Sequence, residues 1–517
     1  MKITAVLLEV ASIQKYVFSS NKLKESLGAS YLIENIFKYN LETALEEISL
    51  GTVNLDEWRK SPGKVSICGT DIEMEVGYIG GGNAMLFFKD AETAVELAKQ
   101  WSKRLLIEAP GLMPSIAINK NIECADLSDK DKFQPVIGNL FRILSENKYE
   151  NQPQTTLPRH GITAECSHTG LSGECYDKDD NIYISSVAKS KIANVEKAKN
   201  EMKKKFRDVL KDKYDFPAEL DKLGQNEGDN YISIVHIDGN GMGKRFQSCR
   251  TLEEIRNLSR AVHEATERSF IELLGNIIQN YGYFEENFRL SNNMLPIRPI
   301  IMGGDDVTFV SHGKLGVYFA EIFMKAFTGQ KVSDKSRLSS CAGIAITKTK
   351  YPFYRGYNLA EKLCSHAKKN AREEEGSSWL DFHIAYGGFS GSIEDIRKKN
   401  YSVSERNLCL RPYRVVSEKE DYQNLSECIK GIRYLKISDQ TKWPNSKLSE
   451  LREALGLGIP AVRMFLKEMA YRGRFLPDVK NQPECRETGW ISDVNKTPYF
   501  DMLELMEFYP VDLGGNK

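Results

Sequence analysis

Apolar residues recur at strand and helix spacings, in the same order, in two separate stretches of the chain. The first stretch predicts a strand, a helix, two strands joined by a tight turn, a helix and a last strand, over residues 3–9, 21–48, 74–88, 91–107 and 112–119. Asn21 is a candidate N-cap for the long helix, and Gly80-Gly81-Gly82-Asn83 marks the turn. This order is that of a ferredoxin-like, split β-α-β unit.

The second stretch repeats this order and adds a helix. Its elements are predicted over residues 231–237, 251–281, 297–302, 307–311, 315–327, 340–346 and 357–373. The two stretches can be overlaid with GGNAMLFF (81–88) on GGDDVTFV (303–310). The other matches are Glu9 with Asp238, Asn83 with Asp305, Ala84 with Asp306, and IAINK (116–120) with IAITK (344–348). We interpret the agreement as an internal duplication.

Three carboxylates are predicted to meet at one edge of the second unit. Asp238 ends its first strand, and Asp305 and Asp306 occupy the turn between its second and third strands. The first and third strands of such a unit are neighbours, so the turn approaches the end of the first strand. Clustered carboxylates repel one another unless cations fill the site. Two Mg²⁺ or Mn²⁺ ions there can activate a 3′-hydroxyl and stabilise a leaving pyrophosphate. Taken alone, GGDD is equally typical of a plain hairpin turn.

Glycines and one lysine complete the predicted nucleotide site. Gly303 and Gly304 permit positive φ and let a triphosphate approach the backbone. Gly239 and Asn240 directly follow the carboxylate that ends the first strand, so we include them in the nucleotide site. Lys368, on the helix after the last strand, is predicted to reach a phosphate, and a solvated surface lysine is the alternative.

The first unit lacks this chemistry. It keeps Glu9, but the overlay puts Asn83 and Ala84 where the second unit has its paired aspartates. We therefore predict a non-catalytic partner. Its glycines Gly80, Gly81 and Gly82 either cradle a nucleotide or only form a tight turn.

Composition narrows the class of protein. Lys plus Arg and Asp plus Glu both number 71 in 517 residues, so any nucleic-acid contact must be local. No apolar run approaches the ~20 residues of a membrane span, and the first residues predict a strand rather than a signal peptide. The ten cysteines include no CxxC pair, which favours reduced thiols and a cytoplasmic location.

At these motifs the sequence resembles the large palm-domain subunit of type III CRISPR effector complexes, which makes cyclic oligoadenylates. IQKYVFSSNKLKESLGASYLIE (13–34) is similar to the opening of that family's first palm. Its second palm is similar to HIDGNGMGKRF (236–246), PIIMGGDDVTFV (299–310), SSCAGIAITKTKYPF (339–353) and LAEKLCSHAKKN (359–370). The resemblance implies that Asp238, Asp305 and Asp306 are metal ligands and that Lys368 contacts phosphate.

Pattern and resemblance together predict an α+β protein with two ferredoxin-like palm domains of the nucleotidyl cyclase type. A middle insert separates the palms and a mainly helical domain ends the chain. At roughly 100–200 residues per domain the length suits this division. The predicted boundaries are 1–120, 121–230, 231–389 and 390–517.

The sequence departs from the family in two ways. Many members begin with a histidine-aspartate nuclease domain, but this sequence starts at the first palm and no histidine precedes an aspartate, so we predict no nuclease. Members often carry a cysteine-rich zinc module between the palms. Here only Cys166, His168 and Cys175 cluster, with Cys124 or His160 as a fourth ligand. Structural zinc sites usually pair their ligands two to four residues apart, so we expect no zinc.

The leading functional hypothesis is a nucleotidyltransferase that converts ATP, or another NTP, to 3′–5′-linked cyclic oligonucleotides and pyrophosphate. The resemblance implies that the product is a second messenger in antiviral defence. A GGDEF-like dinucleotide cyclase is one alternative. Another is an RNA-guided effector scaffold that binds nucleotide with little turnover. In the scaffold, the basic stretches 189–213 and 397–414 contact RNA or partner subunits, although each is also typical of a solvated face.

Overall fold

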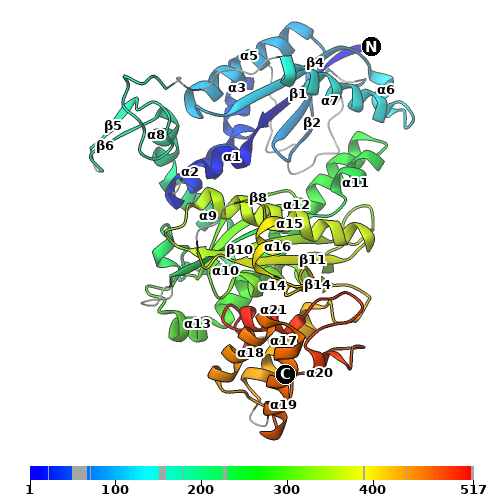
Figure 1. Ribbon diagram of the computed structural model, residues 1–517. Helices are drawn as coiled ribbons and strands as arrows, with labels where there is room; N and C mark the ends of the chain where they lie inside the picture. Colours follow the sequence, from blue (N-terminus) through cyan, green and yellow to red (C-terminus); the bar gives the residue numbers. More distant parts are fainter. Residues whose placement is uncertain are drawn as a thin grey trace.

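Two sheets with their helices and a C-terminal group of helices follow one another along the molecule (Figure 1). The computed structural model describes residues 1–20, 22–48, 67–69, 71–150, 156, 159–178, 180–224, 230–387, 391–438 and 441–513. Within that part of the chain, we find no helix with the length and apolar character that a membrane crossing requires.

The first palm is a four-stranded antiparallel sheet in the order β2-β3-β1-β4. Its strands are β1 (Lys2–Ala11), β2 (Met74–Gly80), β3 (Asn83–Phe88) and β4 (Met113–Glu123). Its helices are α1 (Ile13–Phe18), α2 (Leu23–Ile36), α3 (Tyr39–Glu47) and α5 (Ala91–Glu108). This strand order confirms the ferredoxin-like prediction.

The single helix predicted over 21–48 is wrong, because the chain breaks between α2 and α3. The indole of Trp101 donates a hydrogen bond to the carbonyl of Ile36 (3.3 Å) and stacks on Phe37 with ring centroids 5.6 Å apart. The last carbonyl of α2 is therefore satisfied by a side chain rather than by a further helical turn. The predicted N-cap, Asn21, lies outside the described residues.

The insert packs against α2 of the first palm. Its elements are α6 (Cys124–Ser128), α7 (Phe133–Glu150), β5 (Cys175–Asp177), β6 (Ile182–Ile184), α8 (Ser186–Ala193), α9 (Val195–Lys205), α10 (Arg207–Leu210) and a 3₁₀ turn (Leu220–Leu223). Helices α8 and α9 contact α2, whereas α7 covers β4 and β1. The basic stretch 189–213 is thus mainly helical.

The cysteines differ from prediction at one place. Cys68 and Cys124 form a disulfide with their Cα atoms 5.7 Å apart, so the prediction of reduced thiols is wrong for this pair. Cys124 therefore cannot be the fourth ligand beside Cys166. His168 instead places Nδ1 2.5 Å from Oε1 of Glu25 in α2, with both side chains buried. No zinc-type cluster is present among the described residues, and the absence of bound zinc stays a prediction.

The second palm repeats the four-stranded order and extends it. The sheet runs β14-β11-β10-β7-β9-β8. Its strands are β7 (Tyr231–Gly239), β8 (Ile297–Gly303), β9 (Asp306–His312), β10 (Ser340–Lys348), β11 (Ser378–Ile384) and β14 (Tyr413–Val416). Its helices are α11 (Met242–Ser248), α12 (Leu252–Gln279), α13 (Tyr281–Phe288), α14 (Gly316–Gly329) and α15 (Phe353–Glu373).

The C-terminal part is mainly helical, as predicted, but it also supplies β14 to the palm sheet. Its other elements are α16 (Ile393–Asn400), β12 (Ser402–Val403), β13 (Arg406–Asn407), α17 (Leu425–Lys436), α18 (Asn445–Leu457), α19 (Ile459–Tyr471), α20 (Cys485–Thr488) and α21 (Pro498–Leu505). The domain boundaries stay predictions.

Strand pairing corrects the overlay of the two palms. Gly80 pairs with Asn83 across the first turn, and Gly303 pairs with Asp306 across the second. Next to these turns, Leu8 pairs with Ala84 and Ile237 with Val307, so Glu9 and Asp238 do correspond. The match of Asn83 with Asp305 and of Ala84 with Asp306 is wrong by one residue. The match of IAINK with IAITK is wrong by two, because Ile118 pairs with Val6 as Ile344 pairs with Val235. Gly82 takes the place of Asp305, and Asn83 takes the place of Asp306.

The two palms dock on each other reciprocally. A bulge in β2 exposes the carbonyls of Val76 and Gly77, and Arg256 of α12 donates to both. Arg256 also forms an ion pair with Glu75 at 2.7 Å, each side chain only 5% exposed. A matching bulge in β8 exposes the carbonyl of Ile300, which accepts a hydrogen bond from Ser30 of α2. The first long helix of each palm thus contacts the second strand of the other.

Candidate active site

Asp238 and Lys368 come together although they lie 130 residues apart. Asp238 ends β7, and the ammonium of Lys368 donates to its Oδ2. Helix α15 carries the lysine and lies directly on β10, where a side chain at Gly343 would overlap the carbonyl of Ala360. Burial acts to lower the pKa of Lys368, but the charge of Asp238 outweighs it and the net pKa is raised. The lysine is therefore a fixed cation at the strand end rather than a solvated surface residue.

Asp305 sits against the backbone of Gly239. A Cβ at position 239 would lie 2.7 Å from both Cβ and Oδ2 of Asp305, so only glycine leaves room there. Burial, followed by the negative charge of Asp238, raises the pKa of Asp305 to about 6. The turn thus brings Asp305 beside the end of β7, as the strand order predicts.

Asp306 points to groups that the sequence analysis did not single out. Its Oδ1 lies 3.3 Å from Nδ1 of His236, and its Oδ2 accepts from the side-chain amide of Gln14 at 3.5 Å. Burial acts to lower the pKa of His236, but Asp306 outweighs it and the net pKa is raised. Gln14 belongs to α1, so the first palm reaches the carboxylates of the second.

Asn240 is held by the protein itself. Its side-chain amide donates to Oγ of Ser339 (3.2 Å) and to the carbonyl of Ser377 (3.1 Å), and its backbone N–H donates to the carbonyl of Ser339. These bonds tie the end of β7 to the loops before β10 and β11. Its predicted contact with nucleotide remains untested.

Both glycine turns border one cavity of about 480 Å³ between the palms. Gly80, Gly81 and Gly82 line it from the first palm, and Gly303 and Gly304 line it from the second. The carbonyl of Gly304 accepts a hydrogen bond from Thr266 at 2.6 Å, which fixes the second turn to α12. The predicted nucleotide-binding glycines of the two palms are therefore brought together, although about 220 residues separate them in sequence.

The three carboxylates have the donor chemistry for a divalent cation, because they crowd negative charge at one edge and raise the pKa of Asp305. In the described residues they do not form a ready cluster of three metal ligands. The ammonium of Lys368 holds Asp238 instead, and Asp306 turns toward His236 and Gln14. A cation bound here would compete with Lys368 for Asp238.

One of the missed residues was within reach of sequence reasoning. His236 lies two residues before Asp238 on the same strand, and the period of two places both on one face. Gln14 and Arg256 act across the palm–palm interface, so no local pattern marks them.

The sheet order and the GGDD turn beside Asp238 define a palm domain of the nucleotidyl cyclase type. Residues 231–375 match the sequence model of the family described as Cas10/Cmr2, second palm domain. The second palm is therefore similar to the second palm domain of Cas10/Cmr2, and the predicted resemblance to the large subunit of type III CRISPR complexes is confirmed. No curated protein matches the chain.

Solved structures share the fold over nearly the whole chain. Csm1 in T.onnurineus matches with a TM-score of 0.56 and 14% identity over 98% of this chain and 70% of that one. A Csm1–Csm4 cassette in complex with cA4 matches with a TM-score of 0.55 and 13% identity, over 98% of this chain and 70% of that one. The cassette in complex with AMPPNP matches with a TM-score of 0.55 and 13% identity, over 98% of this chain and 69% of that one. This likeness confirms the α+β fold with two palms.

Proposed function

We propose that the chain is a metal-dependent nucleotidyltransferase that converts ATP, or another NTP, to 3′–5′-linked cyclic oligonucleotides and pyrophosphate. The observation that carries the proposal is the shared cavity, where the glycine turns of both palms meet next to Asp305 and Asp306. Two nucleotides must face each other for such a reaction, and one chain here supplies both turns.

The cavity lining suits a nucleoside triphosphate. Its walls combine apolar side chains, such as Phe37 and Met302, with the basic residues Lys205, Arg260 and His263. Apolar walls accommodate a base, and cationic side chains favour phosphate. We assign the donor nucleotide to the side of Gly303 and the acceptor to the side of Gly80 to Gly82.

The reaction joins the acceptor's 3′-oxygen to the donor's α-phosphorus and breaks the bond to pyrophosphate. The proton of the 3′-hydroxyl passes to solvent water as the new bond forms. Lys368, released from Asp238, can neutralise phosphate charge. Mg²⁺ or Mn²⁺ held by Asp238, Asp305 and Asp306 would neutralise charge on the reacting phosphates. Orientation by the paired turns is the remaining contribution of the chain.

The products would act as second messengers in CRISPR-type antiviral defence, with effector subunits and RNA as partners. The family of the second palm and the ligands named for the Csm1–Csm4 structures support this part of the proposal.

The direct test is to incubate the purified chain with each labelled NTP and Mg²⁺ or Mn²⁺ and to resolve the products by mass. We expect cyclic oligonucleotides from one preferred NTP and none without metal. Nucleotide binding without any product under these conditions would contradict the proposal and favour the scaffold.

A structure with a nonreactive NTP analogue tests the arrangement of the palms. We expect two nucleotides per chain, facing each other across the cavity, with metal only beside Asp305. Replacing Gly82 by leucine should weaken the acceptor site more than the donor site, because a side chain there meets Ile13 at 2.5 Å. One nucleotide per chain, completed by a second copy of 231–385, would instead favour the GGDEF-like dimer.

A further inference from the structure

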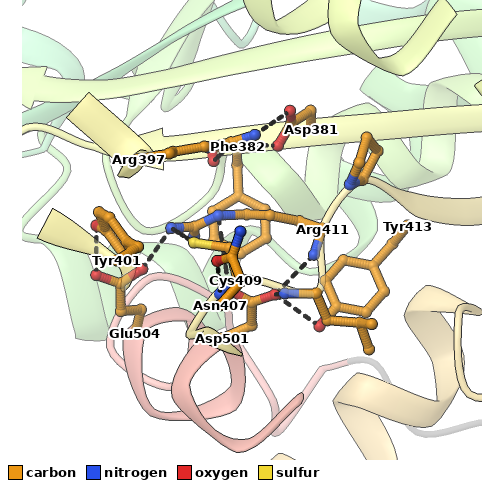
Figure 2. A network of polar contacts seen from close by, with 12 residues as sticks. Asp381, Phe382, Arg397, Tyr401, Asn407, Cys409, Arg411, Tyr413, Asp501 and Glu504 are labelled. Carbon is orange, nitrogen blue, oxygen red and sulfur yellow. Dashed lines mark hydrogen bonds and ion pairs between the residues drawn. The ribbon is translucent and has the colours of Figure 1, made fainter. Parts of the chain in front are cut away.

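In the basic stretch 397–414, three arginines are buried whereas Lys398 and Lys399 are exposed, so its prediction as a solvated face is wrong for the arginines. Arg397, Arg411 and Arg414 are 8%, 2% and 7% exposed. Figure 2 shows Arg397 and Arg411 at the junction between the second palm and the C-terminal helices. Asp381 of β11 pairs with Arg397, and Glu504 of α21 pairs with Arg411.

These two arginines line a second cavity of about 320 Å³, remote from the glycine turns. Its other lining residues are His366, Glu394, Lys398, Ser402, Asn407, Cys409 and Lys496. Five of the nine lining side chains are thus basic and one is acidic. The carboxylates of Asp381 and Glu504 lie behind the arginines and do not line the cavity.

Arg411 retains hydrogen-bonding capacity that the protein does not use. Its guanidinium lies 4.3 Å from the ring centroid of Phe382 and 5.2 Å from that of Tyr401. Nη2 donates to Glu504 (2.8 Å) and to Sγ of Cys409 (3.4 Å), whereas the buried Nη1 has no hydrogen-bond partner in the described structure. A buried donor without an acceptor destabilises the folded state, so an acceptor in the cavity would relieve this cost.

Arg397 is fixed from behind in the same way. Its two terminal nitrogens donate to Asp381 at 2.8 and 2.7 Å, and its buried Nε has no hydrogen-bond partner in the described structure. Lys398 and Lys496 also line the cavity, and in the described part of the chain neither lies within ion-pair distance of a carboxylate. Asp381, Glu504 and Asp501 compensate the charge of the two arginines, so the unpaired positive charge at the cavity is that of Lys398 and Lys496.

We propose that this cavity binds the phosphate group of a small anionic ligand, either free phosphate or pyrophosphate or a nucleotide. Guanidinium groups recognise phosphate through fixed, paired N–H donors, and lysines add charge. The volume lies at the lower end of the range for small-molecule sites. The site lies outside the proposed catalytic cavity, and its occupancy does not depend on the proposed function.

The test measures thermal unfolding of the full chain in EDTA with inorganic phosphate, pyrophosphate, AMP or a 5′-phosphorylated triadenylate. A variant with Lys398→Glu and Lys496→Glu reverses the charge at the cavity. The matched control, Lys362→Glu with Lys467→Glu, makes the same charge change at lysines that do not line it. A ligand that binds only the folded state raises the melting temperature in proportion to its affinity.

We expect at least one of the three small probes to stabilise the wild type and the control, with at least tenfold weaker binding in the cavity variant. Hydrogen exchange of residues 393–411 should slow on binding in the wild type and in the control, but not in the cavity variant. Which small probe binds most tightly identifies the source of the phosphate. Equal stabilisation of all three proteins, no stabilisation by any probe, or a response to the trinucleotide alone would overturn the proposal.

Discussion

The two palms share one topology, but they differ where the first strand meets the turn. One palm has its glycine on the strand and the other has it in the turn. In the second palm, Gly239 on the first strand leaves room for Asp305 in the turn. In the first palm, Val10 stands in the strand position and Gly82 in the turn position, with Val10 N–H donating to the Gly82 carbonyl at 3.1 Å. The carboxylate in the turn therefore requires a glycine opposite it, and loss of one removes the need for the other.

Other features are kept in both palms. Glu9 forms an ion pair with Lys148 of α7 at 2.7 Å, as Asp238 does with Lys368 of α15. Helix α7 covers β4 and β1 as α15 covers β10 and β7, so α7 corresponds to α15. The first palm thus has the scaffold and the glycine turn that the shared cavity needs, but it has neither the paired acids nor the strand glycine of the second palm.

The largest expected difference between the palms is in catalysis. Asp305→Ala with Asp306→Ala should abolish product formation, a loss of roughly a thousandfold or more, because the charge-stabilising site disappears. Glu9→Gln in the first palm should leave most of the activity. Product yield per chain at saturating NTP measures both. Undiminished synthesis by the double variant would refute the assignment.

The reciprocal docking contacts should differ in energy although they are related by the duplication. Arg256→Met leaves Glu75 buried without its partner and should destabilise the fold by about 3–5 kcal/mol. Ser30→Ala removes one neutral hydrogen bond and should cost about 1 kcal/mol. Denaturant unfolding of both variants provides the comparison. Equal losses would show that the charged contact adds nothing beyond a neutral one.

Ionised Asp305 should lower the free energy of unfolding. The first palm has no such effect, because Gly82 stands in the corresponding position. The folded-state pKa is raised from 3.8 to about 6, so the native protein holds this proton more tightly than the unfolded chain does. Ionising Asp305 therefore destabilises the fold as pH rises through 4 to 6, and the cost is fully present above pH 6. Asp305→Asn should be more stable than wild type by roughly 3 kcal/mol at pH 7.5 in EDTA. A gain that persists at pH 4 would contradict this origin.

The smallest effect concerns the space beside Asp305. Gly239→Ala should displace that carboxylate and lower kcat roughly tenfold without unfolding the protein. Gly243→Ala is the matched control, since a Cβ there meets nothing within 4 Å. Steady-state kinetics of the two variants decides the point, and equal rates would mean that Asp305 can shift without consequence.

The sequence predicted strand order, turn positions and the neighbourhood of Asp238 and Asp305, because each follows from periodicity and one topology rule. It failed by two residues in aligning the last strands of the palms and by one residue in aligning their turns. Three consecutive glycines, Gly80 to Gly82, offer two ways to match the pair in GGDD, and only strand pairing decides between them. Local composition also predicted an exposed Arg411, which is buried. Its partners Asp501 and Glu504 lie about 90 residues further along the chain.

The reciprocal docking of α2 on β8 and of α12 on β2 within one chain has a kinetic consequence. Enzymes assembled from two identical halves lose activity on dilution, because the halves meet in a second-order encounter. Here the covalent link sets a high and constant effective concentration of one palm for the other. Specific activity should therefore be the same at nanomolar and micromolar protein, and any cellular control must act on the assembled molecule rather than on the joining of its halves.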